Sequence, residues 1–199
     1  MRDGGIVLNV ANKITLFRIF LIPVFMIFML VDFSFGDVKL FNEEIPIHHF
    51  IGALIFILAS ATDWLDGYVA RKYDLITNLG KFLDPLADKI LVTAALVALV
   101  HLQFAPAWIV IIILSREFAV TGIRLIAAGE GEVIAASSLA KWKTASQLIA
   151  IAVLLLYNIP FTLIPFPFGD VMLWIALILT VLSGIDYFWK NRKLLLNSK

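Results

Sequence analysis

Long apolar stretches alternate with short polar segments along the chain, and this pattern predicts six membrane-spanning helices. A helix needs about 20 mostly apolar residues to cross a hydrocarbon layer of roughly 30 Å. Stretches that reach this length, with some extension at their ends, occur near residues 14–32, 49–71, 85–103, 105–128, 138–158 and 171–190. We therefore predict an all-α integral membrane protein that forms a single domain over residues 1–199, preceded by a short interfacial helix in its first twelve residues.

The composition supports this prediction. Hydrophobic residues make up 61% of the chain and charged residues only 16%, and the mean hydropathy is +0.96. A soluble domain of this size could not hide so much apolar surface. The chain has no cysteine, so disulfide bonds and thiol chemistry are excluded. We expect membrane lipids, and no nucleic acid, among its partners.

The basic residues predict the orientation of the helices. In the six-helix arrangement every Lys and Arg except Lys39 falls on the side that holds both termini. Cytoplasmic segments of membrane proteins carry an excess of Lys and Arg. Both termini are therefore predicted to be cytoplasmic, in a multi-pass protein of the cell membrane.

Four acidic residues share a helical spacing near that cytoplasmic side. Asp63 and Asp66 are three residues apart, and Asp84 and Asp88 are four apart, so each pair lies on one face of a helix. The uncharged run 50–62 is too short to span a bilayer, which places the first pair inside the inner leaflet. Carboxylates at that depth are costly unless they are paired or bind a cation. Oxygen-only ligands favour one or two Mg²⁺ or Mn²⁺ ions. The alternative is a set of surface carboxylates paired with neighbouring Lys and Arg residues.

The same stretch carries a longer pattern of fixed residues. It reads Asp63-x-x-Asp66-Gly67-x-x-Ala70-Arg71, then eight residues, then Gly80-x-x-x-Asp84-x-x-x-Asp88. This resembles the complete signature of the CDP-alcohol phosphatidyltransferases, and all of its fixed positions are present. The resemblance implies a six-helix membrane enzyme that displaces CMP from a CDP-linked lipid, CDP-diacylglycerol. It also implies a homodimer.

The resemblance further implies roles for individual residues. The metal ligands would be Asp63, Asp66 and Asp84, with Asp88 sharing a second ion and acting as the general base. The residues predicted to bind CDP are Asp63, Asp66, Gly67, Ala70, Arg71, Gly80 and Thr15.

Basic residues elsewhere in the chain predict where the second substrate binds. Arg116 and Arg124 occur in the fourth apolar stretch, and Lys141 and Lys143 begin the fifth. An arginine guanidinium can donate two parallel hydrogen bonds to the oxygens of one phosphate, so these residues suit an acceptor with its own phosphate. Alternatively, Glu117 forms a structural ion pair with one of the arginines, and the lysines are interfacial anchors. Arg18 is either a further phosphate ligand or a side chain that reaches out to the membrane surface.

The acceptor follows from a second resemblance within the family. The patterns R-E-F-x-V-T-G-x-R, from Arg116 to Arg124, and K-x-K-T-x-x-Q, from Lys141 to Gln147, resemble the members that use sn-glycerol 3-phosphate. One departure is Ala140, where those members have glycine. Inositol phosphate, serine and phosphatidylglycerol stay open as acceptors. Two alternative hypotheses assign the chain to other classes of protein: a cation transporter and a non-catalytic lipid-binding scaffold.

Overall fold

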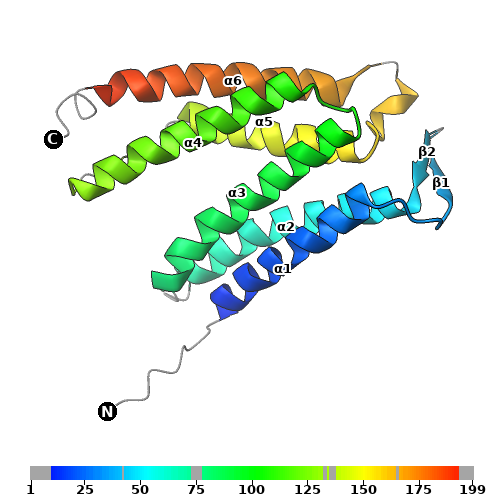
Figure 1. Cartoon of the computed structure of the whole chain (residues 1–199), viewed down its shortest axis with the longest axis horizontal. Coiled ribbons are helices and arrows are strands. Elements are labelled where there is room, and N and C mark those ends of the chain that lie inside the picture. The colour runs from blue at the N-terminus through cyan, green and yellow to red at the C-terminus, as the bar shows by residue number, and fades with distance from the viewer. Residues whose placement is uncertain are drawn as a thin grey trace, which may run out of the picture. The chain divides into compact units, whose positions relative to one another are not determined.

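The computed structural model describes residues 10–41, 43–72, 78–131, 134, 138–164 and 166–192; the side chains of residues 10, 11, 63–72, 78, 79, 81 and 82 lie outside this description. The elements, in chain order, are α1 (Val10–Leu30), β1 (Asp37–Leu40), β2 (Glu43–Pro46), α2 (Ile47–Lys72), α3 (Asn78–His101), α4 (Ala107–Gly129), α5 (Ser138–Leu155), the 3-10 turn η1 (Phe161–Leu163) and α6 (Phe168–Lys190) (Figure 1). The mostly helical architecture confirms the predicted class in outline. The predicted interfacial helix falls on residues that lie largely outside the described part.

Two details differ from the sequence-based expectation. The segment between the first two helices, which in the sequence pattern is only a short polar connection, contains a two-stranded hairpin, β1–β2. Polar and apolar residues alternate from Asp37 to Leu40, which is the period of a strand, and the pattern is too short to stand out among the long apolar runs. The third helix begins at Asn78 and not near residue 85, because the helix continues through Pro85. Proline removes one backbone donor and is tolerated here inside the helix.

The chain divides into two compact units, and the structure defines each on its own. Unit 1 comprises Met1–Leu40 and Glu44–Ala98; unit 2 comprises Phe41–Glu43 and Leu99–Lys199. In unit 1, α1 packs against α2, and the rings of Phe25 and Phe56 lie 6.0 Å apart at their centres. A Cβ atom at Gly52 would lie 2.4 Å from the sulfur of Met29, so a larger residue there would force the Met29 side chain to move.

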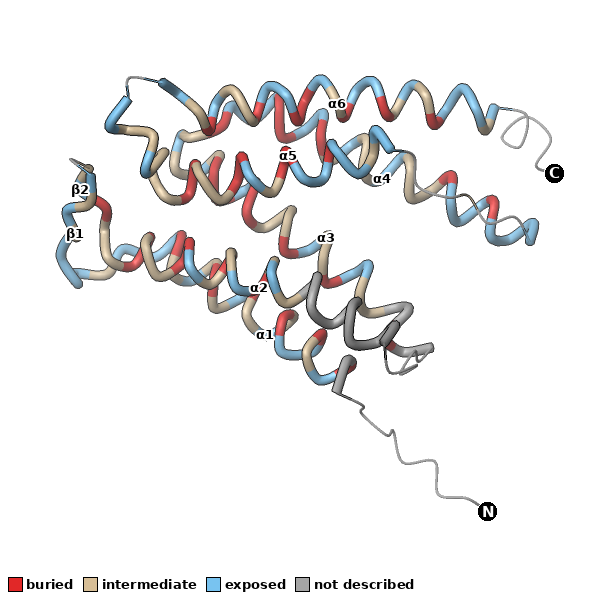
Figure 2. The backbone as a smooth tube through the Cα atoms, turned by 180° about the vertical axis from the view of Figure 1, so that it is seen from behind, coloured by how far each residue is buried: buried red, intermediate tan, exposed pale blue. Residues whose placement is uncertain are grey.

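In unit 2, α6 packs against both α5 and α4. Figure 2 shows buried positions recurring along α5 and α6. At one end Gly169 allows Leu154 to approach, since a Cβ atom there would lie 2.7 Å from a methyl group of that leucine. The other end of α6 holds buried polar residues, Thr180 and Ser183, instead of a purely apolar core. This polar end belongs to the candidate site.

The surface of the helices is strongly apolar. Large hydrophobic side chains such as Phe20, Leu125 and Trp142 are more than half exposed. Among the described residues, two helical segments, Asn12–Leu30 and Phe168–Lys190, are long and apolar enough to cross a membrane. The run Ile47–Thr62 is apolar but shorter, because charged residues follow it in α2. These features are those of a membrane protein.

Candidate functional site

The acidic residues of the signature lie on two helices of unit 1. The backbone of α2 includes Asp63 and Asp66, whose side chains lie outside the described residues, as do those of Gly67, Ala70 and Arg71. Helix α3 carries Gly80, Asp84 and Asp88 at intervals of four residues. Gly80 is buried, and both carboxylates are half-buried. The earlier start of α3 therefore places all three residues on one continuous helical face.

Helix α1 contributes a direct contact to this face. The hydroxyl of Thr15 donates a hydrogen bond of 2.6 Å to the Asp84 carboxylate. Thr15 is buried, with 1% of its surface exposed. Arg18 lies one turn further along the same helix and is fully buried. A snorkelling arginine would keep its charged head in water, so the structure does not fit that alternative for Arg18.

The donor set on α3 suits a hard divalent ion. Asp84 and Asp88 offer carboxylate oxygens, which Mg²⁺ and Mn²⁺ prefer as ligands. The hydroxyl of Thr15 occupies one acceptor position of Asp84, and a carboxylate has about four. Among the side chains that the structure describes, no group of three potential ligands comes together. Two of the four predicted ligands, Asp63 and Asp66, fall outside that set.

A second polar cluster lies inside unit 2, where α4, α5 and α6 meet. One oxygen of Glu117, Oε1, accepts hydrogen bonds from Lys143 Nζ and, at 3.4 Å, from Arg116 Nη1. The second terminal nitrogen of Arg116, Nη2, donates to the hydroxyl of Ser183 at 3.0 Å. Lys143 is buried and Arg116 is largely buried. The structure thus brings two of the predicted phosphate ligands, Arg116 and Lys143, to one place.

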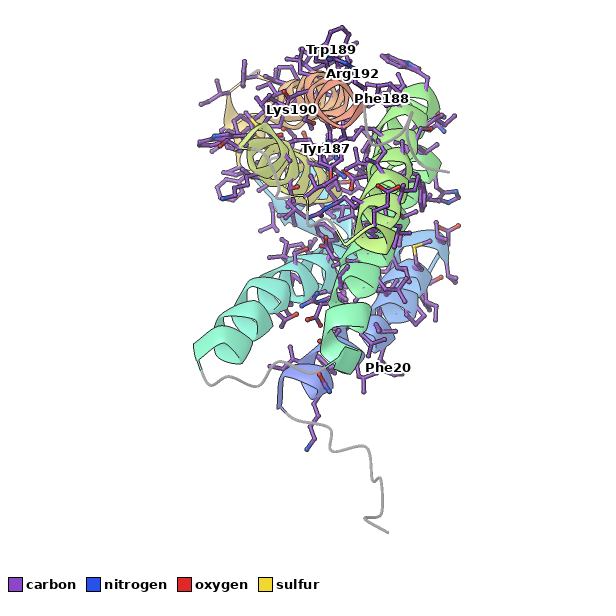
Figure 3. The ribbon with its side chains drawn as sticks, turned by 90° about the vertical axis from the view of Figure 1, so that its left-hand side faces the viewer. Phe20, Tyr187, Phe188, Trp189, Lys190 and Arg192 are labelled. Atoms are coloured by element: carbon purple, nitrogen blue, oxygen red, sulfur yellow. The ribbon has the colours of Figure 1, made fainter. Side chains whose placement is uncertain are left out.

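Helix α6 supplies residues to this cluster that the sequence analysis treated only as part of a membrane span. Ser183 and Tyr187 are one turn apart, and both are buried. The Tyr187 hydroxyl makes no hydrogen bond of ordinary geometry with the described residues, although Arg116 and Arg124 lie within electrostatic reach of it. Figure 3 shows Tyr187 on the side of α6 toward α4 and α5, and Trp189 on the opposite side. A tyrosine and a serine four residues apart in an apolar helix are the signal that could have revealed them.

A glycine permits the contact between α4 and α6. A Cβ atom at Gly184 would lie 3.1 Å from Cγ of Arg116, which is tighter than ordinary van der Waals contact. Because Gly184 has no side chain, the aliphatic part of Arg116 lies against α6 and its guanidinium reaches Ser183. Gln147 lies one turn beyond Lys143 on α5, and its buried Oε1 atom has no hydrogen-bond partner in the described part of the chain. The cluster therefore contains buried polar atoms that a small polar ligand could satisfy.

The other two predicted ligands on these helices occupy different positions. Arg124 is exposed, and its guanidinium donates to the carbonyl of Ile134 at 3.1 Å. Lys141 is exposed as well and lines a shallow hollow of about 370 Å³ beside Trp142. Residues two apart on a helix point in different directions, which explains why Lys141 does not join Lys143.

Comparisons with known proteins agree on one family. The family model described as CDP-alcohol phosphatidyltransferase matches residues 8–182. A protein of Bacillus subtilis (strain 168), named CDP-diacylglycerol--glycerol-3-phosphate 3-phosphatidyltransferase, is 60% identical over 92% of this chain and 95% of its own length. Proteins with the same name from Haemophilus influenzae and Rickettsia bellii are 40% and 38% identical, over 90% and 93% of this chain and 91% and 96% of their own lengths.

Proposed function

The chain belongs to the CDP-alcohol phosphatidyltransferase family, and from this premise we propose that it transfers a phosphatidyl group from CDP-diacylglycerol to sn-glycerol 3-phosphate, releasing CMP. The observation that carries this proposal is the 60% identity, over almost the whole of both chains, to a relative named for that reaction. The relatives' names favour glycerol 3-phosphate over inositol phosphate, serine and phosphatidylglycerol. The enzyme would act in phospholipid biosynthesis.

The residues of α3 suit the chemical step. The acceptor's hydroxyl oxygen forms a bond to the phosphorus that carries the diacylglycerol, and the bond from that phosphorus to CMP breaks. CMP leaves with the electron pair, and Asp88 takes the proton of the hydroxyl as general base. Asp63, Asp66 and Asp84, with Asp88, would hold one or two Mg²⁺ or Mn²⁺ ions. When bound, such ions neutralise charge on the two phosphates as CMP leaves.

Two further groups would bind the substrates. Gly67, Ala70, Arg71 and Gly80 would line the cytidine site, with Thr15 supporting Asp84 through its hydroxyl. Arg116 and Lys143 would bind the acceptor's phosphate, together with Ser183 and Tyr187 from α6. Roles for Arg18, Arg124 and Lys141 in acceptor binding, and the homodimer, stay predictions from the sequence.

The membrane setting follows from the same premise. Six spans with cytoplasmic termini would put the acids and the basic cluster on the cytoplasmic side. There a lipid donor keeps its chains in the bilayer while its head group meets a soluble acceptor. Labelling of single cysteines introduced at Lys39 and Lys190 by a membrane-impermeant reagent tests this orientation, since the parent chain has no cysteine. Intact cells should label the first position and not the second.

The reaction itself is tested by CMP release. Purified protein in detergent micelles with CDP-diacylglycerol and Mg²⁺ should release CMP when glycerol 3-phosphate is added and not without it. Inositol phosphate, serine and phosphatidylglycerol, each supplied in the same assay, should give no comparable release. Release with one of these and not with glycerol 3-phosphate would keep the family and overturn the acceptor. Absence of release with every acceptor would overturn the activity.

A further inference from the structure

The feature that goes beyond the proposed reaction is the position of Glu117 within the basic cluster. Its Oε1 atom is shared by Lys143 Nζ and Arg116 Nη1, which come from α5 and α4. A carboxylate oxygen and a phosphate oxygen are equivalent partners for such cations, since both accept charge-assisted hydrogen bonds of similar length. Glu117 therefore holds the same donors that the phosphate of the acceptor requires.

Burial shows which member of this cluster is able to withdraw. The side chain of Lys143 is 5% exposed and that of Arg116 is 12% exposed, while that of Glu117 is 24% exposed. Buried cations require a counter-charge, because an unpaired charge away from water is costly. Arg116 is also fixed by its bond to Ser183 on α6. Among the residues that the structure describes, the Glu117 carboxylate contacts no comparable second anchor, and its side chain is the most exposed of the three.

The charges in the cluster argue against simultaneous binding of Glu117 and a phosphate to the same donors. Arg116 and Lys143 contribute two positive charges and Glu117 one negative charge, which leaves a net charge of +1. A phosphate monoester carries about −1.5 to −2 at neutral pH. Two anions on one pair of donors repel each other, and this repulsion is strong where water is scarce. One of the two must give way.

We propose that Glu117 is an internal stand-in for the phosphate of the acceptor. Its carboxylate holds Arg116 and Lys143 in place until the acceptor binds, and the phosphate then displaces it from both donors. This inference rests on the proposed function, because it takes a phosphomonoester as the acceptor. Weakly bound anions, such as inorganic phosphate, must compete with the Glu117 carboxylate for the same two donors. Glu117 therefore lowers the affinity of the site for every anion, and only anions that bind strongly occupy it.

The same exchange acts when the product leaves. The transferred lipid product keeps the phosphate of the acceptor, so it stays bound to Arg116 and Lys143 after the chemical step. Return of the Glu117 carboxylate to these donors supplies a counter-charge and favours dissociation of the product. Glu117 is thus a positioning residue that lowers the affinity for the acceptor and raises the rate of product release. It does not touch the reacting phosphorus.

The test is the variant Glu117→Gln, which keeps the shape of the side chain and removes its charge. KM for glycerol 3-phosphate and the inhibition constant of inorganic phosphate should each fall about tenfold, the effect of losing one close charge interaction. The value of kcat should fall, because product release becomes slower, and KM for CDP-diacylglycerol should stay unchanged. If Glu117 formed only a structural ion pair, KM for glycerol 3-phosphate would instead rise in this variant, because Lys143 would lose its position.

Two further variants complete the experiment. Glu117→Asp keeps the charge on a shorter side chain that reaches the donors less well, so it should shift both constants in the same direction by a smaller factor. If Glu117→Gln does not fold, this variant carries the test. Asp186→Asn is the matched control, since it removes a carboxylate from the exposed ion pair with Lys190 on α6 and should change neither constant.

An unchanged or raised KM for glycerol 3-phosphate in the folded variants overturns the proposal. Failure of the proposed function is a separate result, because the wild-type protein would then release no CMP with glycerol 3-phosphate. In that event binding of inorganic phosphate to the wild type and to Glu117→Gln still decides the stand-in role. Equal affinity in the two proteins would contradict it.

Discussion

Two carboxylates, Asp84 in unit 1 and Glu117 in unit 2, differ in the partners that hold them. Asp84 accepts a hydrogen bond from the neutral hydroxyl of Thr15, whereas one oxygen of Glu117 contacts two cations. A neutral donor orients a carboxylate and leaves its charge uncompensated, which suits a ligand for a metal ion. Two cations compensate the charge and make the carboxylate part of a closed cluster. The proposed roles differ accordingly: Asp84 would bind a metal ion, and Glu117 would hold two cations in place for the acceptor.

The largest effect is expected on the acidic side, from Asp88→Asn. Loss of the proposed general base should lower kcat for CMP release by about 10³-fold, within the range measured for such groups. The amide is similar in shape, so the variant should fold with an unchanged melting temperature. Asp170→Asn is the matched control, because Asp170 is exposed in the first turn of α6. If Asp88→Asn retains full activity, the assignment of the base, and with it the chemical role of this face of α3, is wrong.

On the basic side, Lys143→Met should raise KM for glycerol 3-phosphate by about 100-fold, as expected when one partner of a buried charge pair is removed. KM for CDP-diacylglycerol should stay within twofold of its original value, roughly the scatter of such measurements. Lys190→Met removes a lysine from an exposed ion pair with Asp186. It serves as the control and should change neither KM value, because exposed ion pairs contribute little. A parallel rise in both KM values would contradict a site for the acceptor alone.

Tyr187→Phe tests whether α6 contributes to the same cluster. The change removes only the buried hydroxyl, and it should raise KM for glycerol 3-phosphate about tenfold, the usual value of one hydrogen bond to a charged group. Stability should not fall, because that hydroxyl makes no hydrogen bond of ordinary geometry with the described residues. Tyr157→Phe, after the far end of α5, is the control. Wild-type kinetics for Tyr187→Phe would show that the acceptor site is confined to α4 and α5.

Thr15→Val tests the neutral donor of the acidic side. Valine has the same shape without the hydroxyl, so Asp84 loses its hydrogen bond and part of its orientation. Activity at limiting Mg²⁺ should fall about fivefold, and excess Mg²⁺ should restore part of it, since partners of metal ligands affect metal affinity. The control is Thr144→Val on α5, where the hydroxyl is exposed and bonds only to its own helix. No dependence on the Mg²⁺ concentration would separate Thr15 from the predicted metal site.

The smallest effect is expected from Gly184→Ala, which adds a methyl group 3.1 Å from the stem of Arg116. Arg116 must then shift by a few tenths of an ångström, and KM for glycerol 3-phosphate should rise about twofold. Gly122→Ala on α4 is a close match, because nothing lies within 4 Å of the added atom. That control should leave KM unchanged and stabilise the protein by about 0.5–1 kcal/mol, the usual gain of alanine over glycine in a helix. Equal kinetic effects of the two changes would show that the approach of Arg116 to α6 is unimportant.

Local patterns account for what could be predicted. The length of each apolar run predicts the helices α1 to α6, and the helical repeat predicts that Asp84 and Asp88 share one face. Both are properties of neighbouring residues, so they can be read from the chain. The boundary of α3 was placed too late because Pro85 resembles a helix start, and the hairpin was missed because its alternation covers only a few residues.

The sequence by itself determined the membrane character of this protein, its six helical segments and the spacing of its acidic signature. Only the tertiary structure placed Ser183 and Tyr187 of α6 in the basic cluster with Arg116, and only it separated Lys143, paired with Glu117, from exposed Lys141. The physical reason is distance along the chain. The periodicity of a helix fixes which residues share a face, but the packing of α4 and α5 against α6 decides which faces meet.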